Sequence, residues 1–165
     1  MARVDATHAL HILQEEHQHL RALFQDFREA ADESLRRKIL DVCGAELRAQ
    51  IAVEDSVLYA RLTLPSDDET LAALRADHAW TLAEIADVEE AAHAGQAYQE
   101  KFLGLTRRWL EHQARQETAL YPRLAGSGDE LKRLGLDMLE RKREVLAEDP
   151  TPAADTTSSH DQAEG

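Results

Sequence analysis

Polar residues interrupt four otherwise apolar stretches of the sequence, each time near the middle of the stretch. These interruptions are three histidines, one glutamate and two glutamines: His17, Gln50, Glu54, His78, His112 and Gln116. Imidazole and carboxylate groups together suit iron, manganese or zinc. A buried carboxylate such as Glu54 is costly unless it is paired or binds a metal. The residue types therefore point to a metal site in the protein interior.

The spacing of these residues indicates that they meet. Gln50 and Glu54 are four residues apart, as are His112 and Gln116, so each pair lies on one face of a helix. In an antiparallel bundle the helix midpoints lie at a similar height, and metal sites in bundles are built from inward-facing side chains of several helices. We therefore predict that the three histidines and Glu54 converge in one buried layer. The alternative is a layer of hydrogen-bonded core residues without a metal.

Four helices are needed to position this layer. Apolar residues recur every three or four positions in the segments 10–27, 40–57, 71–88 and 98–119, as expected for helices that bury one face. The breaks between them lie at 31–34, at 65–66 and at Gly95. Short connections between consecutive helices favour an up-down-up-down arrangement. The predicted fold class is all-α, an antiparallel up-down-up-down four-helix bundle.

Two capping-box patterns mark further helix starts. Ser66 with Glu69 precedes the third helix, and Ser127 with Glu130 opens an additional C-terminal helix that runs to about Leu146. The remaining residues are polar and acidic and have no apolar periodicity, which is typical of disorder. The predicted organisation is one helical domain over 1–147 and a disordered acidic tail over 148–165.

The chain also contains an internal repeat. Residues 50–62 and 112–124 share the pattern of two polar residues four apart followed by Leu-Tyr-x-Arg-Leu, and a second match pairs His17 with His78. The simplest explanation is two related helical hairpins packed face to face. Tyr59 and Tyr121 occupy equivalent places in this repeat, and we expect them to pack at the edge of the core.

Net charge, hydropathy and cysteine content limit the partners and the location that we expect for this protein. The formal net charge is -13, which opposes binding to nucleic acid or to an anionic membrane. No apolar run is long enough to span a bilayer, and the N-terminus lacks the design of a secretory signal. The single cysteine, Cys43, excludes an internal disulfide and fits a reducing compartment. We expect a soluble, cytoplasmic protein of unknown oligomeric state.

The sequence resembles the hemerythrin-like, or HHE cation-binding, family over about residues 8–147. The resemblance rests on the segments EEHQHLRALF, RAQIAVEDSVLYARL, RADHAWTLAEI and EHQARQETALYPRL. The family pattern places a histidine on the first and third helices, and a histidine followed by a carboxylate on the second and fourth. His17, Glu54, His78 and His112 match this pattern. The resemblance implies a helical bundle in which these residues ligate non-haem iron, as a di-iron or a single-iron centre, although another divalent metal remains open.

Two positions depart from the family pattern. Gln50 stands where the second-helix histidine is expected, and Gln116 stands where one form of the family has a glutamate. Glu117 fits the alternative, longer spacing from His112 and would supply the second carboxylate. The resemblance thus implies a stronger half of the site, His78 and His112 with Glu54 and Glu117, and a weaker half around His17.

Three functions follow from this sequence. The first is a metal-binding protein that binds or senses dioxygen, nitric oxide or peroxide, or that handles iron. The second is a di-iron oxidoreductase that decomposes peroxide or nitric oxide, so whether the protein is an enzyme stays open. The third is a metal-free structural or interaction bundle that keeps its polar layer as a hydrogen-bond network.

Overall fold

The computed structural model describes residues 7–62, 68–124 and 126–148, and all regular structure in these residues is helical. The all-α prediction is therefore confirmed. Five long helices account for most of the chain: α1 (Ala9–Glu29), α2 (Glu33–Val53), α4 (Glu69–His93), α5 (Gln99–Arg115) and α6 (Gly128–Glu148). No helix among the described residues is long and apolar enough to cross a membrane.

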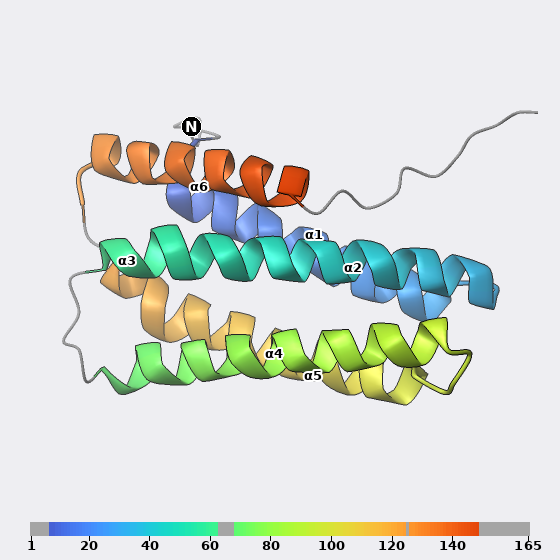
Figure 1. The fold of residues 1–165 in the computed structure, drawn as a ribbon. Helices are drawn as coiled ribbons and strands as arrows, with labels where there is room; N and C mark the ends of the chain where they lie inside the picture. Colours follow the sequence, from blue (N-terminus) through green and yellow to red (C-terminus); the bar gives the residue numbers. More distant parts are fainter. Residues whose placement is uncertain (1–6, 63–67, 125, 149–165) are drawn as a thin grey trace, which may run out of the picture.

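The long helices lie side by side, with the connections α1–α2 and α4–α5 at the same end of the molecule (Figure 1). α1 packs on α2, α4 packs on α5, and α2 joins the two hairpins through contacts with α4. α6 covers α1 and α2 (Figure 1). The two hairpins and the added helix match the arrangement that the internal repeat and the capping pattern indicated.

The core consists of two separate apolar clusters. One contains Phe24, Phe102 and Trp109, and the other contains Leu13, Leu58, Leu74, Leu120 and Met138. The chain passes from one cluster to the other along α1, along α4, and along α2 and α5 together with the short helical segments that follow each of these two. The polar residues of the sequence prediction lie between the clusters. The polar layer is thus flanked on both sides by apolar packing, which keeps water away from it.

Side-chain caps define the helix starts. Asp32 accepts a hydrogen bond from the Leu35 amide at the start of α2, and Asp68 accepts one from the Leu71 amide at the start of α4. Ser66 of the first predicted capping box lies outside the described residues. The second box is confirmed, because the Ser127 amide donates to Glu130 Oε2 at 2.7 Å and the Glu130 amide donates to Ser127 Oγ at 3.3 Å.

Two π-helical segments interrupt the regular helices, and the apolar periodicity did not predict them. α2 continues into a π-helix over Glu54–Leu58 and a turn of α-helix, α3 (Tyr59–Arg61). α5 continues into a π-helix over Gln116–Leu120 and a 3₁₀ turn over Tyr121–Arg123, which contains Pro122. The two π-helices begin at repeat-equivalent residues. Such wide turns are rare in proteins, and those that do occur are frequently found at functional sites.

α6 begins at Gly128 and reaches Glu148, two residues beyond its predicted end near Leu146. The predicted disordered tail, 148–165, therefore begins at the last residue of this helix. Its other residues, 149–165, lie outside the described residues.

Candidate metal centre

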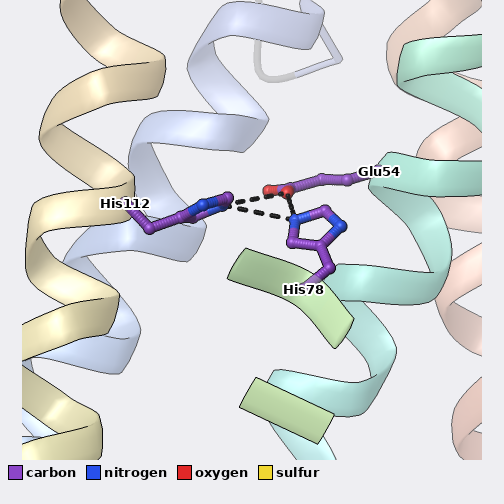
Figure 2. A group of neighbouring side chains, drawn as sticks. All are labelled: Glu54, His78 and His112. Carbon is purple, nitrogen blue, oxygen red and sulfur yellow. Dashed lines mark hydrogen bonds and ion pairs between the residues drawn. The ribbon is translucent and has the colours of Figure 1, made fainter. Parts of the chain in front are cut away.

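Three buried side chains from three different segments bring their polar atoms to one point (Figure 2). His78 Nε2 lies 2.9 Å from Glu54 Oε2 and 3.3 Å from His112 Nε2, and His112 Nε2 lies 3.7 Å from Glu54 Oε2. Glu54 starts the first π-helix, His78 comes from α4 and His112 from α5. Two imidazoles and a carboxylate, with one ligand atom from each within 4.8 Å of the others, form a donor set that fits a transition-metal ion.

The outer nitrogens of both imidazoles contact carboxylates. His78 Nδ1 lies 2.9 Å from Asp55 Oδ1, and His112 Nδ1 lies 3.3 Å from Asp77 Oδ2. Asp77 is itself paired with Arg108 and Arg115. A carboxylate on the outer nitrogen fixes the ring orientation and increases the basicity of the inner nitrogen, as is common for metal-binding histidines. Both Nε2 atoms therefore face the interior.

Burial and charge oppose each other at this cluster. Burial lowers the pKa of His78, but the hydrogen bonds to Asp55 and Glu54 outweigh it and raise that pKa to about 9. Burial raises the pKa of the Glu54 carboxyl, but the imidazoles of His112 and His78 outweigh it and hold that pKa well below its usual range. In the absence of a metal ion, the positive charge of His78 thus balances the buried carboxylate.

His17 lies in a second, adjoining part of the polar layer. Its Nδ1–H donates to Glu117 Oε1 at 2.8 Å, and its Nε2 lies 3.0 Å from both Gln116 Oε1 and the Tyr121 hydroxyl. This hydrogen bond from His17 is the main reason why the pKa of the Glu117 carboxyl is lowered. The inner nitrogen of His17 therefore faces an amide and a phenol, whereas the inner nitrogens of His78 and His112 face a carboxylate.

Two glutamines connect the layer to Glu54. Gln116 Nε2 donates to Glu54 Oε2 at 2.7 Å and to the Tyr59 hydroxyl at 2.8 Å. Gln50 Nε2 donates to Glu54 Oε1 at 2.9 Å, while Gln50 Oε1 is buried without a hydrogen-bond partner among the described residues. Both glutamines thus use their side-chain nitrogen to stabilise the charge of Glu54.

Six of the seven residues singled out from the sequence lie together in the buried layer, as the spacing of the stripes indicated. They are His17, Gln50, Glu54, His78, His112 and Gln116. Glu117 differs, because its side chain is 38% exposed and bonds to the outer nitrogen of His17 and to Arg21. It is not part of the cluster of Glu54, His78 and His112 that could hold a metal. Its ligand role stays a prediction that this placement does not favour.

Asp55 and Asp77, which contact the outer nitrogens of His78 and His112, were not predicted from the sequence. Asp55 and Glu117 are equivalent in the repeat with offset 62, and each contacts the Nδ1 atom of the equivalent histidine, His78 or His17. The tyrosines do more than pack at the core edge. Tyr59 donates to Glu54 Oε2 at 3.3 Å, and Tyr121 contacts His17.

A helical fold with buried histidines and a glutamate between two apolar clusters has the donor arrangement that metal-binding helical bundles use. The hemerythrin HHE cation binding domain matches residues 8–124, which is most of the chain and includes every residue of the layer. The chain therefore belongs to the hemerythrin HHE cation-binding family. α6 lies outside the matched residues. Neither the curated proteins nor the solved structures contain a significant match.

Proposed function

We propose that this chain binds non-haem iron through His78, His112 and Glu54, within an antiparallel up-down-up-down bundle of α1, α2, α4 and α5. The observation that carries the proposal is the approach of three ligand atoms in one buried layer, with both histidines oriented from outside by Asp55 and Asp77. Two histidines and one carboxylate are a donor set used for iron(II) with open coordination positions.

We further propose that the bound iron serves to bind or sense dioxygen, nitric oxide or peroxide, or that the protein handles iron itself. Three protein ligands leave positions on the metal for a small molecule. The protein's own contribution is to exclude water through the two apolar clusters and to hold the ligand nitrogens in place. A cytoplasmic location is part of the proposal, because a chain with a single cysteine fits a reducing compartment.

Two other functions are favoured by particular observations. The same open positions favour an oxidoreductase that decomposes peroxide or nitric oxide. The hydrogen bonding of the layer favours a metal-free bundle, because the Gln116 amide contacts His17 with its oxygen and donates to Glu54 and Tyr59 with its nitrogen, without an ion. Hydrogen-bonded polar networks can specify a unique core by themselves.

Anaerobic titration with iron(II) separates these functions. Wild type should bind iron tightly, while Glu54→Gln, which keeps the side-chain shape but removes the carboxylate, should weaken binding by more than about tenfold. Nitric oxide added to the loaded protein should produce a new absorption band, and turnover of added peroxide would assign the oxidoreductase. Equal binding by wild type and Glu54→Gln would place the metal elsewhere, and no binding by either would leave the metal-free bundle.

A further inference from the structure

The internal repeat places a second, altered copy of the histidine–carboxylate contact beside the first. Residue equivalence pairs His17 with His78, and Gln116 with Glu54. The distances agree, because His17 Nε2 lies 3.0 Å from Gln116 Oε1 and His78 Nε2 lies 2.9 Å from Glu54 Oε2. The His17 half and the His78 half of the layer therefore share the geometry of this contact. They differ in the group that faces the histidine, which is the Gln116 amide in the first and the Glu54 carboxylate in the second.

Gln116 bridges the two halves with both ends of its amide. Its nitrogen donates to Glu54 Oε2 at 2.7 Å and to Tyr59, and its oxygen lies at hydrogen-bond distance from His17. The side chain is fully buried, at 0% exposure. Each polar atom of this amide thus has a partner on a different segment, so Gln116 joins α1 to the first π-helix across the interior.

A carboxylate at this position could not make the same contacts. It would place an oxygen about where Gln116 Nε2 now lies, 2.7 Å from Glu54 Oε2. Two carboxylates at such a distance repel each other unless a cation or a proton lies between them. The amide removes this need, because its N–H groups supply the positive partial charge that Glu54 requires.

We propose that Gln116 replaces a second metal ion in this chain: its amide links His17 to Glu54 by hydrogen bonds and thereby limits the protein to the one ion at Glu54, His78 and His112. The inference rests on the proposed function for the identity of that one ion. It assigns to Gln116 the role of a residue that determines metal number, and to His17 the role of a hydrogen-bond partner.

The test compares wild type with Gln116→Glu and with a matched control, Gln113→Glu. Gln113 lies three residues away on α5, is also 0% exposed, and accepts a hydrogen bond from Arg21 at 3.1 Å. Both variants add one buried negative charge, but only Gln116 contacts Glu54. Two quantities are measured: iron(II) bound per chain under anaerobic conditions, and the melting temperature of the chelator-treated protein.

Gln116→Glu should raise the iron content from about one to about two per chain, because His17 gains a carboxylate beside it. It should also lower the metal-free melting temperature by roughly 5–10 °C, and iron should restore it. Gln113→Glu should still bind about one iron. If Gln116→Glu folds only when expressed and purified with iron(II), and then holds two ions, the inference also stands.

The inference is overturned if wild type already binds two ions, if Gln116→Glu binds no more iron than wild type, or if it does not fold even with iron(II). These results are distinct from a failure of the proposed function. A wild type that binds no iron, beside a Gln116→Glu variant that binds it, would refute the proposed function and support the role of Gln116. An uncharged variant, Gln116→Leu, should lower the metal-free melting temperature without any gain of iron.

Discussion

At the scale of single residues, the three interior histidines are not equivalent. His78 and His112 direct their inner nitrogens to Glu54, whereas His17 directs its inner nitrogen to Gln116 and Tyr121. The difference lies in their partners, because all three rings are buried and all three have a carboxylate on Nδ1. The metal-binding contributions of the three should therefore differ.

Replacement of single histidines should reveal this difference. His112→Ala removes one of the three ligands and should abolish iron binding, while His17→Ala should leave about one iron per chain. The measurement is iron content after equilibrium dialysis against iron(II), with circular dichroism to confirm that both variants keep their helices. Loss of iron in His17→Ala, with the fold intact, would show that His17 is a ligand.

The charge of His78 predicts how the stability of the metal-free protein depends on pH. Its pKa is raised from 6.5 to about 9 in the folded protein, so its stabilising contribution is fully present below about pH 6.5 and is lost as the pH rises through 9. The melting temperature should therefore fall by several degrees between pH 7 and pH 9. A His78→Gln variant, which cannot titrate at this position, should show a smaller fall. An equal or larger fall in the variant would contradict the assignment.

The residues of the layer were predictable from the sequence because each is a polar residue that interrupts an otherwise apolar stretch. His17, Glu54, His78 and His112 could be recognised in this way. Asp55 and Asp77 could not, since each is adjacent to a layer residue and looks like one more charged residue on a solvent-facing side. Only the pairing of distant segments shows that these acids contact the imidazoles.

At the scale of elements, the π-helices and α6 are the features that shape the site. The π-helices begin at Glu54 and Gln116, so the wider turn alters the direction of the residues that follow, including Asp55 and Glu117. Periodicity alone predicted regular helices here, because a single wide turn shifts the pattern too little to be recognised in sequence. The helix order and most of the breaks followed directly from capping residues, Gly and Pro.

α6 is joined to the bundle by ion pairs and by close backbone packing. Lys142 Nζ lies 2.7 Å from Glu16 Oε1 and 2.9 Å from Glu46 Oε2. Glu16 is the repeat counterpart of Asp77, which contacts His112. Gln50 stands at the position equivalent to His112, so Glu16 has no imidazole at that position to orient. Its carboxylate forms an ion pair with Lys142 instead.

Gly135 allows α6 to approach the start of the chain. A Cβ atom at this position would lie 1.8 Å from the Thr7 carbonyl oxygen and 2.9 Å from Ile12 Cδ1. Gly135→Ala should therefore destabilise the protein by about 1–3 kcal/mol. Gly104→Ala is the control, because the nearest atom, Arg107 Nη2, would be 3.9 Å away, and this change should stabilise α5 by about 0.5–1 kcal/mol. Chemical denaturation of both variants measures the difference, and equal effects would show that α6 is not packed closely here.

At the scale of the whole molecule, the acidic net charge and the apolar packing of the described helices have opposite effects on stability. The formal net charge is -13, and charge of one sign destabilises a compact state through repulsion. The described residues contain both apolar clusters. The last described residue, Glu148, is the end of α6. Stability should therefore reside in the part of the chain that ends with this helix.

Truncation tests that expectation. A chain ending at Ala147 loses polar and acidic residues but no member of either apolar cluster, so its melting temperature should lie within a few degrees of that of the full chain. Thermal unfolding followed by circular dichroism is sufficient for the comparison. A fall of more than about 10 °C would show that the C-terminal residues dock on the bundle.

The most direct measurement of the central claim is the metal content of the protein purified without chelator, together with its ultraviolet-visible spectrum. We expect about one iron per chain, absorption bands that disappear on treatment with chelator, and a melting temperature that rises when iron(II) is restored. The contrary result is a protein with less than about a tenth of an iron per chain and no change in melting temperature on adding iron(II). In that case the buried histidines and Glu54 form a structural hydrogen-bond network and not a metal centre.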